Sequence, residues 1–379
     1  YASGMHCGIK PQKKDLAFIY VPESKASAGV FTTNQFCAPC VEHNRSSLRN
    51  NQIFKLLIVN SGNANAVTGE PGVANVRRTT EVASKFFQCE ASEVAIASTG
   101  IIGVQLPMEK LERGIEELSR EPKASHADNA AQAIMTTDLV PKSAGLKRTI
   151  GDVELSVAGI AKGSGMIAPN MATMLGFMVT DADLSSAELQ TSLTQAVQRS
   201  FNMMSVDTDT STSDMVLLFS TGTKPVADQG AFQELLTEVC IDLAKQIARD
   251  GEGAEKLIEV TVEQAASEQE AQAIAKSIIN SPLVKTAVHG ADPNWGRVIM
   301  AVGKTPHVTV KPEQCSLYFQ DVCVLQNGLP LAFEKAVLRE KLRAKDIFIR
   351  VRLGCGESCA TAWGCDLSKG YIDINVDYN

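Results

Sequence analysis

The chain has 379 residues, of which 44% are hydrophobic and 21% charged, and a formal net charge of −7. This composition is that of an ordinary folded protein and predicts one large domain or two intimately joined domains. The acidic balance and the scattered lysines and arginines argue against a nucleic-acid partner, and no apolar run approaches the roughly 20 residues that span a bilayer.

The chain contains ten cysteines. Its first residues, YASGMHCGIKPQKKD, lack the apolar stretch of a signal peptide, so we expect free thiols in a reducing compartment and a cytoplasmic protein. Cys37 and Cys40 in CAPC have the spacing of a zinc-ligand pair, and CGESCATAWGC (355–365) offers three more cysteines. The second group has three residues between its first two cysteines and no histidine nearby, so ordinary thiols are favoured over zinc ligands.

The N-terminal half alternates apolar strands with turn-rich segments and helices. Strands are expected within FKLLIVNSGNANAVTG (54–69), EVAIASTGIIG (93–103) and RTIGDVELSVAGIAKGSG (148–165). Helices are expected at LERGIEELSR (111–120) and ADNAAQAIMTTD (127–138), the second of which should end near Thr136 and Thr137.

The C-terminal half continues the same alternation, which predicts a mixed α/β or α+β fold with apolar layers. Strands are expected at LGFMVTDA (175–182), DMVLLFSTG (214–222), KLIEVTVE (256–263), DIFIRVRLG (346–354) and YIDINVDY (371–378). Helices are expected at SSAELQTSLTQAVQRSF (185–201), FQELLTEVCIDLAKQIARDG (232–251) and SEQEAQAIAKSIINS (267–281). The last of these opens with Ser267 and Glu270 at capping-box spacing.

Common catalytic motifs find little support. The five histidines lie in unrelated contexts, without an H-E-x-x-H or G-x-S-x-G motif, which disfavours a Ser-His-Asp hydrolase. KGSGMIAP (162–169) is not a phosphate loop, because Lys162 precedes the glycines instead of following them. A tight turn is the simpler interpretation of these glycines.

Thr173, in the apolar stretch PNMATMLGF (169–177), offers another route to catalysis. A hydroxyl nucleophile without histidine can use its own α-amine as the base once it becomes a chain terminus. An α-amine has a pKa of about 7.7–8.0, which suits a general base at neutral pH. Thr173 would become terminal if its hydroxyl attacked the Ala172 carbonyl and the resulting ester were hydrolysed. On residue types alone, a buried threonine at a strand edge is the simpler interpretation.

Many blocks of the sequence resemble, in order, the ornithine acetyltransferase family, the glutamate N-acetyltransferases of the cyclic arginine pathway, which include the arginine biosynthesis bifunctional proteins. The resemblance extends from about Gly8 to the end of the chain. The blocks are VNSGNANAVTG (59–69), ASTGIIG (97–103), AIMTTD (133–138), AKGSGMIAPNMATMLGFMVTDA (161–182), SFNMMSVDTDTSTSDMV (200–216), ARDGEGAEK (248–256), HGADPNWGRVIMAVG (289–303) and ATAWGCDLSKGYIDINVDY (360–378).

The resemblance implies a layered sandwich of mixed sheets flanked by helices, and self-cleavage between Ala172 and Thr173. Residues 1–172 would form an α chain with the oxyanion hole. Residues 173–379 would form a β chain with the nucleophile, the remainder of the catalytic fold and a smaller C-terminal subdomain. Acetyl would move from N-acetylornithine to Thr173 and then to glutamate.

The resemblance implies no metal or organic cofactor. The small-molecule partners would be N-acetylornithine and glutamate, and the α and β chains would associate as a dimer of αβ heterodimers or a larger assembly. Acetyl-CoA stays open as a second donor, although the sequence shows no recognisable site for the CoA phosphates.

The resemblance also implies roles for individual residues. Thr99 and Gly100 match the oxyanion-hole pair. Lys162, Thr137, Thr173, Glu252 and Asn375 match substrate-binding residues. Thr136 is a close alternative to Thr137, and Lys162 would otherwise be a solvated loop lysine. The family's next ligand, a Ser or Thr shortly after Asn375, would fall where the sequence stops, and Glu255 stands where the family is expected to have Thr.

Two other functions remain alternatives. Self-processed aminopeptidases and amidases share the related fold and pass the acyl group to water. An inactive binding or scaffold protein is a third interpretation. Lys162 and Glu252 at matching positions favour amino-acid recognition and acetyl transfer.

Overall fold

The computed structural model describes residues 1–123, 125–167 and 174–376, and the chain divides into two compact units. Unit 1 comprises Tyr1–Gln198 and Asp209–Leu243, and unit 2 comprises Arg199–Thr208 and Ala244–Asn379. The mixed α/β class predicted from the sequence is confirmed by three mixed sheets flanked by helices. The predicted boundary between the α and β chains at 172/173 is a site of backbone cleavage, which is a different property from the division into two packing units. It lies outside the described residues and stays a prediction.

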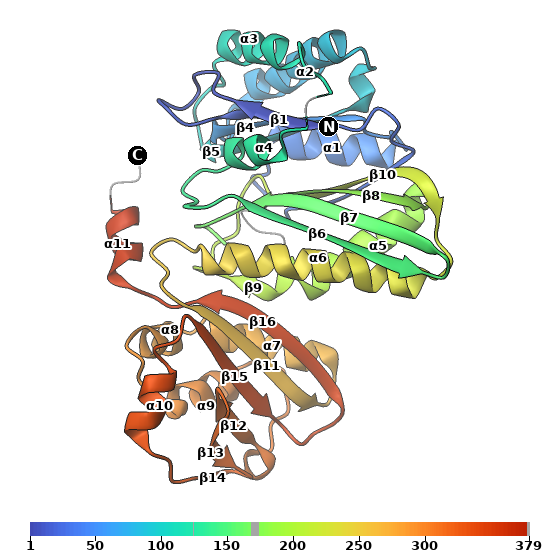
Figure 1. Ribbon diagram of the computed structural model, residues 1–379. Helices are drawn as coiled ribbons and strands as arrows, with labels where there is room; N and C mark the ends of the chain where they lie inside the picture. The colour runs from blue at the N-terminus through green and yellow to red at the C-terminus, as the bar shows by residue number, and fades with distance from the viewer. Residues whose placement is uncertain (124, 168–173, 377–379) are drawn as a thin grey trace. The chain divides into compact units, whose positions relative to one another are not determined.

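Unit 1 contains two sheets that share one hydrophobic core (Figure 1). Sheet 1 has the strand order β1-β2-β4-β5 and sheet 2 the order β3-β10-β8-β7-β6. Each has one parallel pair, β4 with β5 in sheet 1 and β8 with β10 in sheet 2. The strands of sheet 1 are β1 (Ala2–Met5), β2 (Leu16–Tyr20), β4 (Leu56–Asn63) and β5 (Val94–Ile101). Those of sheet 2 are β3 (Ala26–Phe31), β6 (Lys142–Ile150), β7 (Val153–Lys162), β8 (Leu175–Asp183) and β10 (Met215–Pro225).

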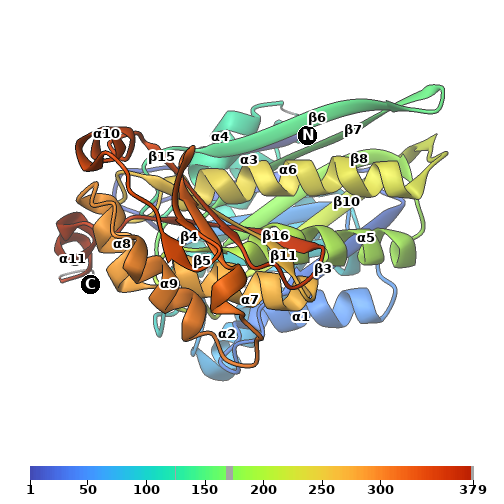
Figure 2. The same cartoon turned by 90° about the horizontal axis from the view of Figure 1, so that it is seen from below.

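Helices cover the two outer faces of this pair of sheets. On sheet 1, Phe87 of α2 packs against Phe18 of β2 with ring centroids 5.1 Å apart. On sheet 2, α5 and α6 lie side by side (Figures 1 and 2), and Cys240 of α6 contacts Met178 of β8. The helices on these faces are α2 (Gly69–Phe87), α3 (Met108–Leu118), α5 (Ser186–Arg199) and α6 (Gln229–Arg249), whereas α1 (Pro39–Arg49) and α4 (Ala127–Ala133) pack against the edge strands β5 and β1 of sheet 1.

Unit 2 is built on a seven-stranded mixed sheet with the order β14-β13-β12-β15-β11-β16-β9. Helix α7 packs on β11 and β16, and its N-cap Ser267 accepts the Glu270 N–H, as its sequence predicts. The strands are β9 (Met204–Ser205), β11 (Leu257–Ala265), β12 (Ser316–Phe319), β13 (Val322–Gln326), β14 (Leu329–Pro330), β15 (Asp346–Arg352) and β16 (Ser358–Cys365). The helices are α7 (Glu268–Ile279), α8 (Pro282–His289), α9 (Trp295–Gly303), α10 (Lys335–Lys341) and α11 (Lys369–Asn375).

Two predicted elements differ from the structure. The helix expected over 127–138 ends at Ala133, because the following backbone is drawn into other contacts: Lys10 donates to the Met135 carbonyl and Asp138 accepts the Thr136 N–H. The strand expected over 371–378 was wrong, since this segment contributes to helix α11. Its alternating isoleucines and valine are exposed, and Ser368 caps the helix by accepting the Gly370 N–H.

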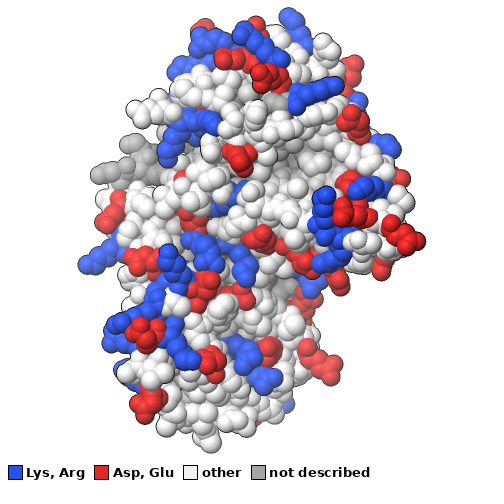
Figure 3. Space-filling view, in the orientation of Figure 1, with Lys and Arg blue, Asp and Glu red and all other residues white. Residues whose placement is uncertain are grey.

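The surface carries charges of both signs. On the face displayed in Figure 3, acidic and basic side chains are interspersed. Among the helices of the described ranges, none is long and apolar enough to cross a membrane.

The open edge of sheet 1 is completed by a buried side chain. Strand β5 is at the edge of its sheet, and Asn44 of α1 pairs with the Ile96 backbone: its Oδ1 accepts the N–H at 3.0 Å and its Nδ2 donates to the carbonyl at 2.7 Å. The amide thus takes the place of a neighbouring strand and satisfies two buried backbone groups.

Replacing this amide should destabilise unit 1. We expect Asn44→Ala to lower the free energy of unfolding by about 2–4 kcal/mol, because it leaves a buried N–H and a buried carbonyl unpaired. Urea denaturation followed by circular dichroism measures the change. Asn50→Ala, at the exposed C-terminal cap of the same helix, is the control and should change stability by less than about 0.5 kcal/mol. Equal effects of the two substitutions would contradict this role.

Candidate active site

Lys162 is the centre of a buried polar cluster in unit 1. It is the last residue of β7 and only 2% exposed, so it is not the solvated loop lysine of the alternative interpretation. Its Nζ donates to Thr136 Oγ1 at 2.7 Å and lies 3.4 Å from Thr99 Oγ1. The fold thus brings together residues from β5, from the segment after α4 and from the end of β7.

The contact with Lys162 distinguishes the two neighbouring threonines. The Thr136 hydroxyl accepts the lysine N–H, and the Thr136 backbone N–H donates to Asp138 at 2.9 Å. Thr137, the residue favoured from the sequence, is half-buried at the next position. Its substrate-binding role stays a prediction, and Thr136 has the described contact within the cluster.

Thr99 and Gly100 lie near the end of β5, where the chain requires glycine. Gly100 has a φ of +134°, and a Cβ there would collide with the backbone of Gly62 and Asn63 in β4. The β4–β5 pairing shifts register between Gly62 and Asn63, which is the signature of a bulge. Because Thr99 Oγ1 faces the Lys162 ammonium, its own proton is available to donate elsewhere. The prediction that this pair forms an oxyanion hole is untested.

Asp138 accepts three hydrogen bonds that hold the residues of the cluster in place. Its Oδ1 accepts from Lys142 Nζ and from the Gly163 N–H, both at 2.7 Å, and its Oδ2 accepts the Thr136 N–H. Burial alone would raise the pKa of this carboxyl. The ammonium groups of Lys162 and Lys142, together with these hydrogen bonds, outweigh burial and hold the pKa well below its usual range. Asp138 is therefore an anion that fixes residues on either side of Lys162.

The predicted nucleophile Thr173 and the preceding Ala172 lie outside the described residues. The structure resumes at Met174, whose backbone N–H donates to Asp214 Oδ1 at 2.8 Å. Burial raises the pKa of the Asp214 carboxyl well above its ordinary value, although the Met174 hydrogen bond and the Lys162 charge act in the opposite direction. A buried carboxyl group thus contacts Met174, the residue that follows the predicted nucleophile in the sequence.

Unit 2 brings the other two predicted substrate-binding residues together. Glu252 is only 7% exposed, and its Oε2 accepts from Asn375 Nδ2 at 2.8 Å. Asn375 is the last residue of α11, not part of a strand as predicted. Gly253 has a φ of +68°, and a Cβ there would collide with the Tyr371 backbone, so glycine allows α11 to approach Glu252. The substrate-binding roles of both residues stay predictions.

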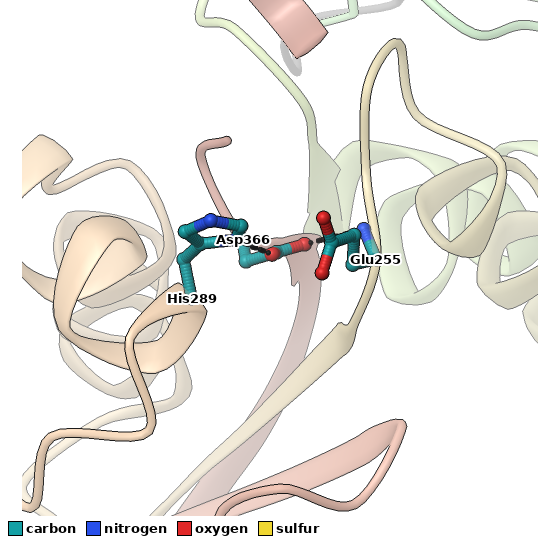
Figure 4. A group of neighbouring side chains, drawn as sticks. All are labelled: Glu255, His289 and Asp366. Atoms are coloured by element: carbon teal, nitrogen blue, oxygen red, sulfur yellow. Dashed lines mark hydrogen bonds and ion pairs between the residues drawn. The ribbon is translucent and has the colours of Figure 1, made fainter. Parts of the chain in front are cut away.

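A second polar cluster in unit 2 has the residue types of a metal site (Figure 4). The ligand atoms of Glu255, His289 and Asp366 lie within 4.8 Å of one another. Asp366 Oδ2 is 2.8 Å from His289 Nδ1, and its Oδ1 accepts the backbone N–H groups of Glu255 and Lys256. Asp366 is thus already engaged in joining α8 to the segment before β11, which gives this cluster a structural role.

An apolar cavity of about 670 Å³ lies elsewhere in unit 1. It is lined by residues of β2, β6, β7 and β8, among them Tyr20, Ser143, Gly159 and Phe177. Neither Lys162 nor Thr99 is among its described lining residues. The cavity and the buried polar cluster around Lys162 are therefore separate features of unit 1.

Three comparisons with known proteins agree with one another. The model of the ArgJ family matches residues 1–379. The arginine biosynthesis bifunctional protein ArgJ of Bacillus thuringiensis subsp. konkukian (strain 97-27) is 44% identical to this chain, covering 100% of it and 94% of the relative. The protein of the same name from Lactococcus lactis subsp. lactis (strain IL1403) is 45% identical, covering 100% of this chain and 96% of the relative.

A crystal structure of the arginine biosynthesis bifunctional protein argJ from Bacillus halodurans is also similar. It is 42% identical with a TM-score of 0.53, and the match covers 54% of this chain and 100% of that one. The fold and the site define the class as a layered α/β protein with a buried lysine–threonine–carboxylate cluster. The full-length matches then show that the chain belongs to the ArgJ family, which confirms the resemblance found in its sequence.

The sequence interpretation overlooked the acidic residues of the cluster. Asp138 directly follows the threonines of AIMTTD, and Lys142 comes four residues later. Asp214 immediately precedes the apolar run of β10. A carboxylate next to the end of an apolar strand is a usable signal for a buried polar site. However, its partners come from distant parts of the chain.

Removing the Asp138 charge should cost stability in a pH-dependent way. Because the folded-state pKa of Asp138 lies below its ordinary value of 3.8, its stabilisation is present above pH 3.8 and is lost as the pH falls through the folded-state pKa. We expect Asp138→Asn to cost about 3–5 kcal/mol near pH 7, since it removes the carboxylate charge that lies 2.7 Å from the buried Lys142 ammonium.

Thermal melting at about pH 7 and about pH 3 measures this difference. The difference in melting temperature between wild type and Asp138→Asn should be smaller at the lower pH. Asp128→Asn, an exposed position on α4, serves as the control and should show a small gap at both values. A large gap of equal size at both pH values would rule out the charge as its source.

Proposed function

We propose that this chain is a self-cleaving acetyltransferase of arginine biosynthesis. It moves acetyl from N2-acetyl-L-ornithine to L-glutamate through an acetyl ester on Thr173. The observation that carries the proposal is membership of the ArgJ family over all 379 residues, with relatives named for arginine biosynthesis. The buried cluster around Lys162 supports it, because it supplies the polar groups that acyl transfer requires. The active protein acts in the cytoplasm as paired α and β chains.

Self-cleavage creates the nucleophile. The Thr173 hydroxyl attacks the Ala172 carbonyl carbon, the C–N bond breaks, and the acyl group moves from nitrogen to oxygen as the nitrogen takes up the hydroxyl proton. Water then hydrolyses the ester, which releases the Ala172 carboxylate and leaves Thr173 with a free α-amine.

Acetyl transfer proceeds in two halves. The α-amine takes the Thr173 hydroxyl proton as the oxygen attacks the acetyl carbonyl of N-acetylornithine, and it returns that proton to the departing ornithine amine. In the second half, the amine of glutamate attacks the acetyl ester, and its proton passes to the Thr173 oxygen. The products are ornithine and N-acetylglutamate, and Thr173 is regenerated.

The cluster in unit 1 supplies the electrostatics. The Thr99 hydroxyl, facing the Lys162 ammonium, directs its proton toward the developing oxyanion, and the Gly100 N–H acts beside it. Lys162 also supplies positive charge for a substrate carboxylate, with Thr136 or Thr137 as a hydroxyl contact. In unit 2, the Glu252 carboxylate, paired with Asn375, suits the δ-ammonium of ornithine.

A second donor has one observation in its favour. The curated relatives are named bifunctional proteins, which favours acetyl-CoA as an additional donor despite the lack of a recognisable CoA-phosphate motif. An assay with acetyl-CoA and glutamate, without N-acetylornithine, decides whether this chain forms acetylglutamate in that way.

The nucleophile is tested by intact mass under denaturing conditions. Wild type should give two fragments that meet between Ala172 and Thr173. Thr173→Ala should give one uncleaved chain without acetyl transfer, and Thr173→Ser should still cleave, more slowly. Fully cleaved and active Thr173→Ala protein would refute the mechanism.

The acceptor is tested with N-acetylornithine in the presence and absence of glutamate. The transferase should form acetylglutamate in amounts matching the ornithine released, and it should release little acetate when glutamate is absent. Rapid acetate release without acetylglutamate would favour the alternative aminopeptidase or amidase. Absence of both reactions in correctly cleaved protein would favour a binding protein.

The oxyanion role of Thr99 is tested by Thr99→Val, which removes the hydroxyl and keeps the shape. We expect kcat to fall about 10²–10³-fold, as is typical when one oxyanion donor is lost. Thr79→Val is the control, because it removes a buried hydroxyl that donates to the Asn75 carbonyl in α2. A kcat for Thr99→Val equal to that of the control would remove Thr99 from the oxyanion hole.

A further inference from the structure

The residue before β8 is held at both of its backbone polar groups. The Met174 N–H donates to Asp214 Oδ1 at 2.8 Å, and the Met174 carbonyl accepts the Met215 N–H at 3.3 Å. Strands β8 and β10 then run in parallel from the pair Leu175 and Met215. Asp214 therefore extends the pairing of the two strands by one residue with its side chain.

Asp214 is itself fixed within unit 1. Its backbone carbonyl accepts the Thr32 N–H at 3.0 Å, and the Thr32 hydroxyl donates to the Ser211 carbonyl at 2.7 Å. Ser213 N–H donates to Ser211 Oγ, which closes the turn before Asp214. The carboxyl group is thus carried by a segment that cannot shift without breaking contacts with the end of β3.

The burial of Asp214 is costly and calls for an explanation. The residue is 1% exposed, and its hydrogen bonds with Met174 and Ser211 only partly offset the loss of water around its carboxyl group. An apolar residue at this position would avoid that loss. Burial also raises the pKa of this carboxyl group well above its ordinary value. The hydrogen bond that the carboxyl group accepts from the Met174 N–H provides a functional reason for retaining it.

We propose that Asp214 is a positioning residue for the nucleophile: by accepting the Met174 N–H, it fixes the peptide bond that joins Thr173 to Met174. This inference rests on the proposed function, because it takes Thr173 as the nucleophile. The peptide group is planar, so holding the Met174 N–H limits the rotation of the peptide unit that contains it. Misplacing a reacting group by about 1 Å can cost about 10²-fold in rate.

The test compares a substitution that keeps a hydrogen-bond acceptor at position 214 with one that removes it. Asp214→Asn keeps an oxygen that can accept the Met174 N–H and resembles the neutral carboxyl in shape. Asp214→Ala removes the acceptor. Thr180→Val is the matched control. It removes a buried hydroxyl from β8, the strand that follows Met174, and this hydroxyl donates to the Ser156 carbonyl at 2.8 Å. Self-cleavage is followed by intact mass, and folding by thermal melting.

We expect Asp214→Asn to cleave within about tenfold of wild type and Asp214→Ala to cleave at least about 100-fold more slowly. Thr180→Val should cleave like wild type although its melting temperature falls as much as that of Asp214→Ala. In the cleaved fraction of Asp214→Ala, kcat for N-acetylornithine should fall about 100-fold while KM changes little. This split distinguishes a misplaced nucleophile from a general loss of structure.

Three outcomes would overturn the proposal. Cleavage of Asp214→Ala at the rate of Thr180→Val would show that the hydrogen bond does not matter. If Asp214→Ala fails to fold, Asp214→Asn decides. A folded Asp214→Asn protein that cleaves more than 100-fold more slowly than wild type would refute the proposal, because this variant retains the acceptor. Wild-type protein without cleavage at Ala172–Thr173 would refute the proposed function and this inference together, whereas the first two outcomes refute this inference alone.

Discussion

A buried carboxylate, Asp138, is the constraint on which the site in unit 1 depends. It lies between two buried ammonium groups, of Lys142 and Lys162, and accepts backbone N–H groups on either side of the cluster. Burying either lysine without a counter-charge would be strongly unfavourable, and the paired carboxylate offsets that cost. The same bonds end helix α4 early and place the Thr136 hydroxyl against Lys162, so packing and site geometry share one cause.

Close approach of backbones provides the second constraint, and it acts in both units. In unit 1, Gly100 lets β5 lie against the bulge of β4, which places Thr99 beside Lys162. In unit 2, Gly253 lets α11 lie against the segment that carries Glu252, which allows Asn375 to pair with it. Each glycine sits at a positive φ where a side chain would collide with the neighbouring backbone. Both glycines adjoin residues that the sequence predicts for the active site, Thr99 and Glu252.

The layers of unit 1 explain how residues so far apart in sequence meet. Sheets 1 and 2 share a core, and strands β5 and β7 carry Thr99 and Lys162 to one place, while the start of β8 meets Asp214 before β10. Parallel pairing of β8 and β10 requires a long connection between them, which α5 and the segment after it provide. Met174, the first described residue after the predicted nucleophile, therefore leads directly into β8 at the centre of sheet 2.

The sequence by itself determined the mixed class and most strands and helices, and its resemblance to a family predicted Thr173 as the nucleophile and roles for the residues matched to it. Periodicity reports burial along one segment, and chain-long blocks report ancestry, so both are readable without coordinates. The alternation of isoleucines over 371–378 misled because helix α11 leaves them exposed, and the pattern alone cannot reveal that. Only the tertiary structure decided that Lys162 is buried, that it bonds Thr136, that Asp138 fixes residues around it, and that Asp214 holds Met174. Their partners are distant in sequence, and a carboxylate's role is set by what packs around it.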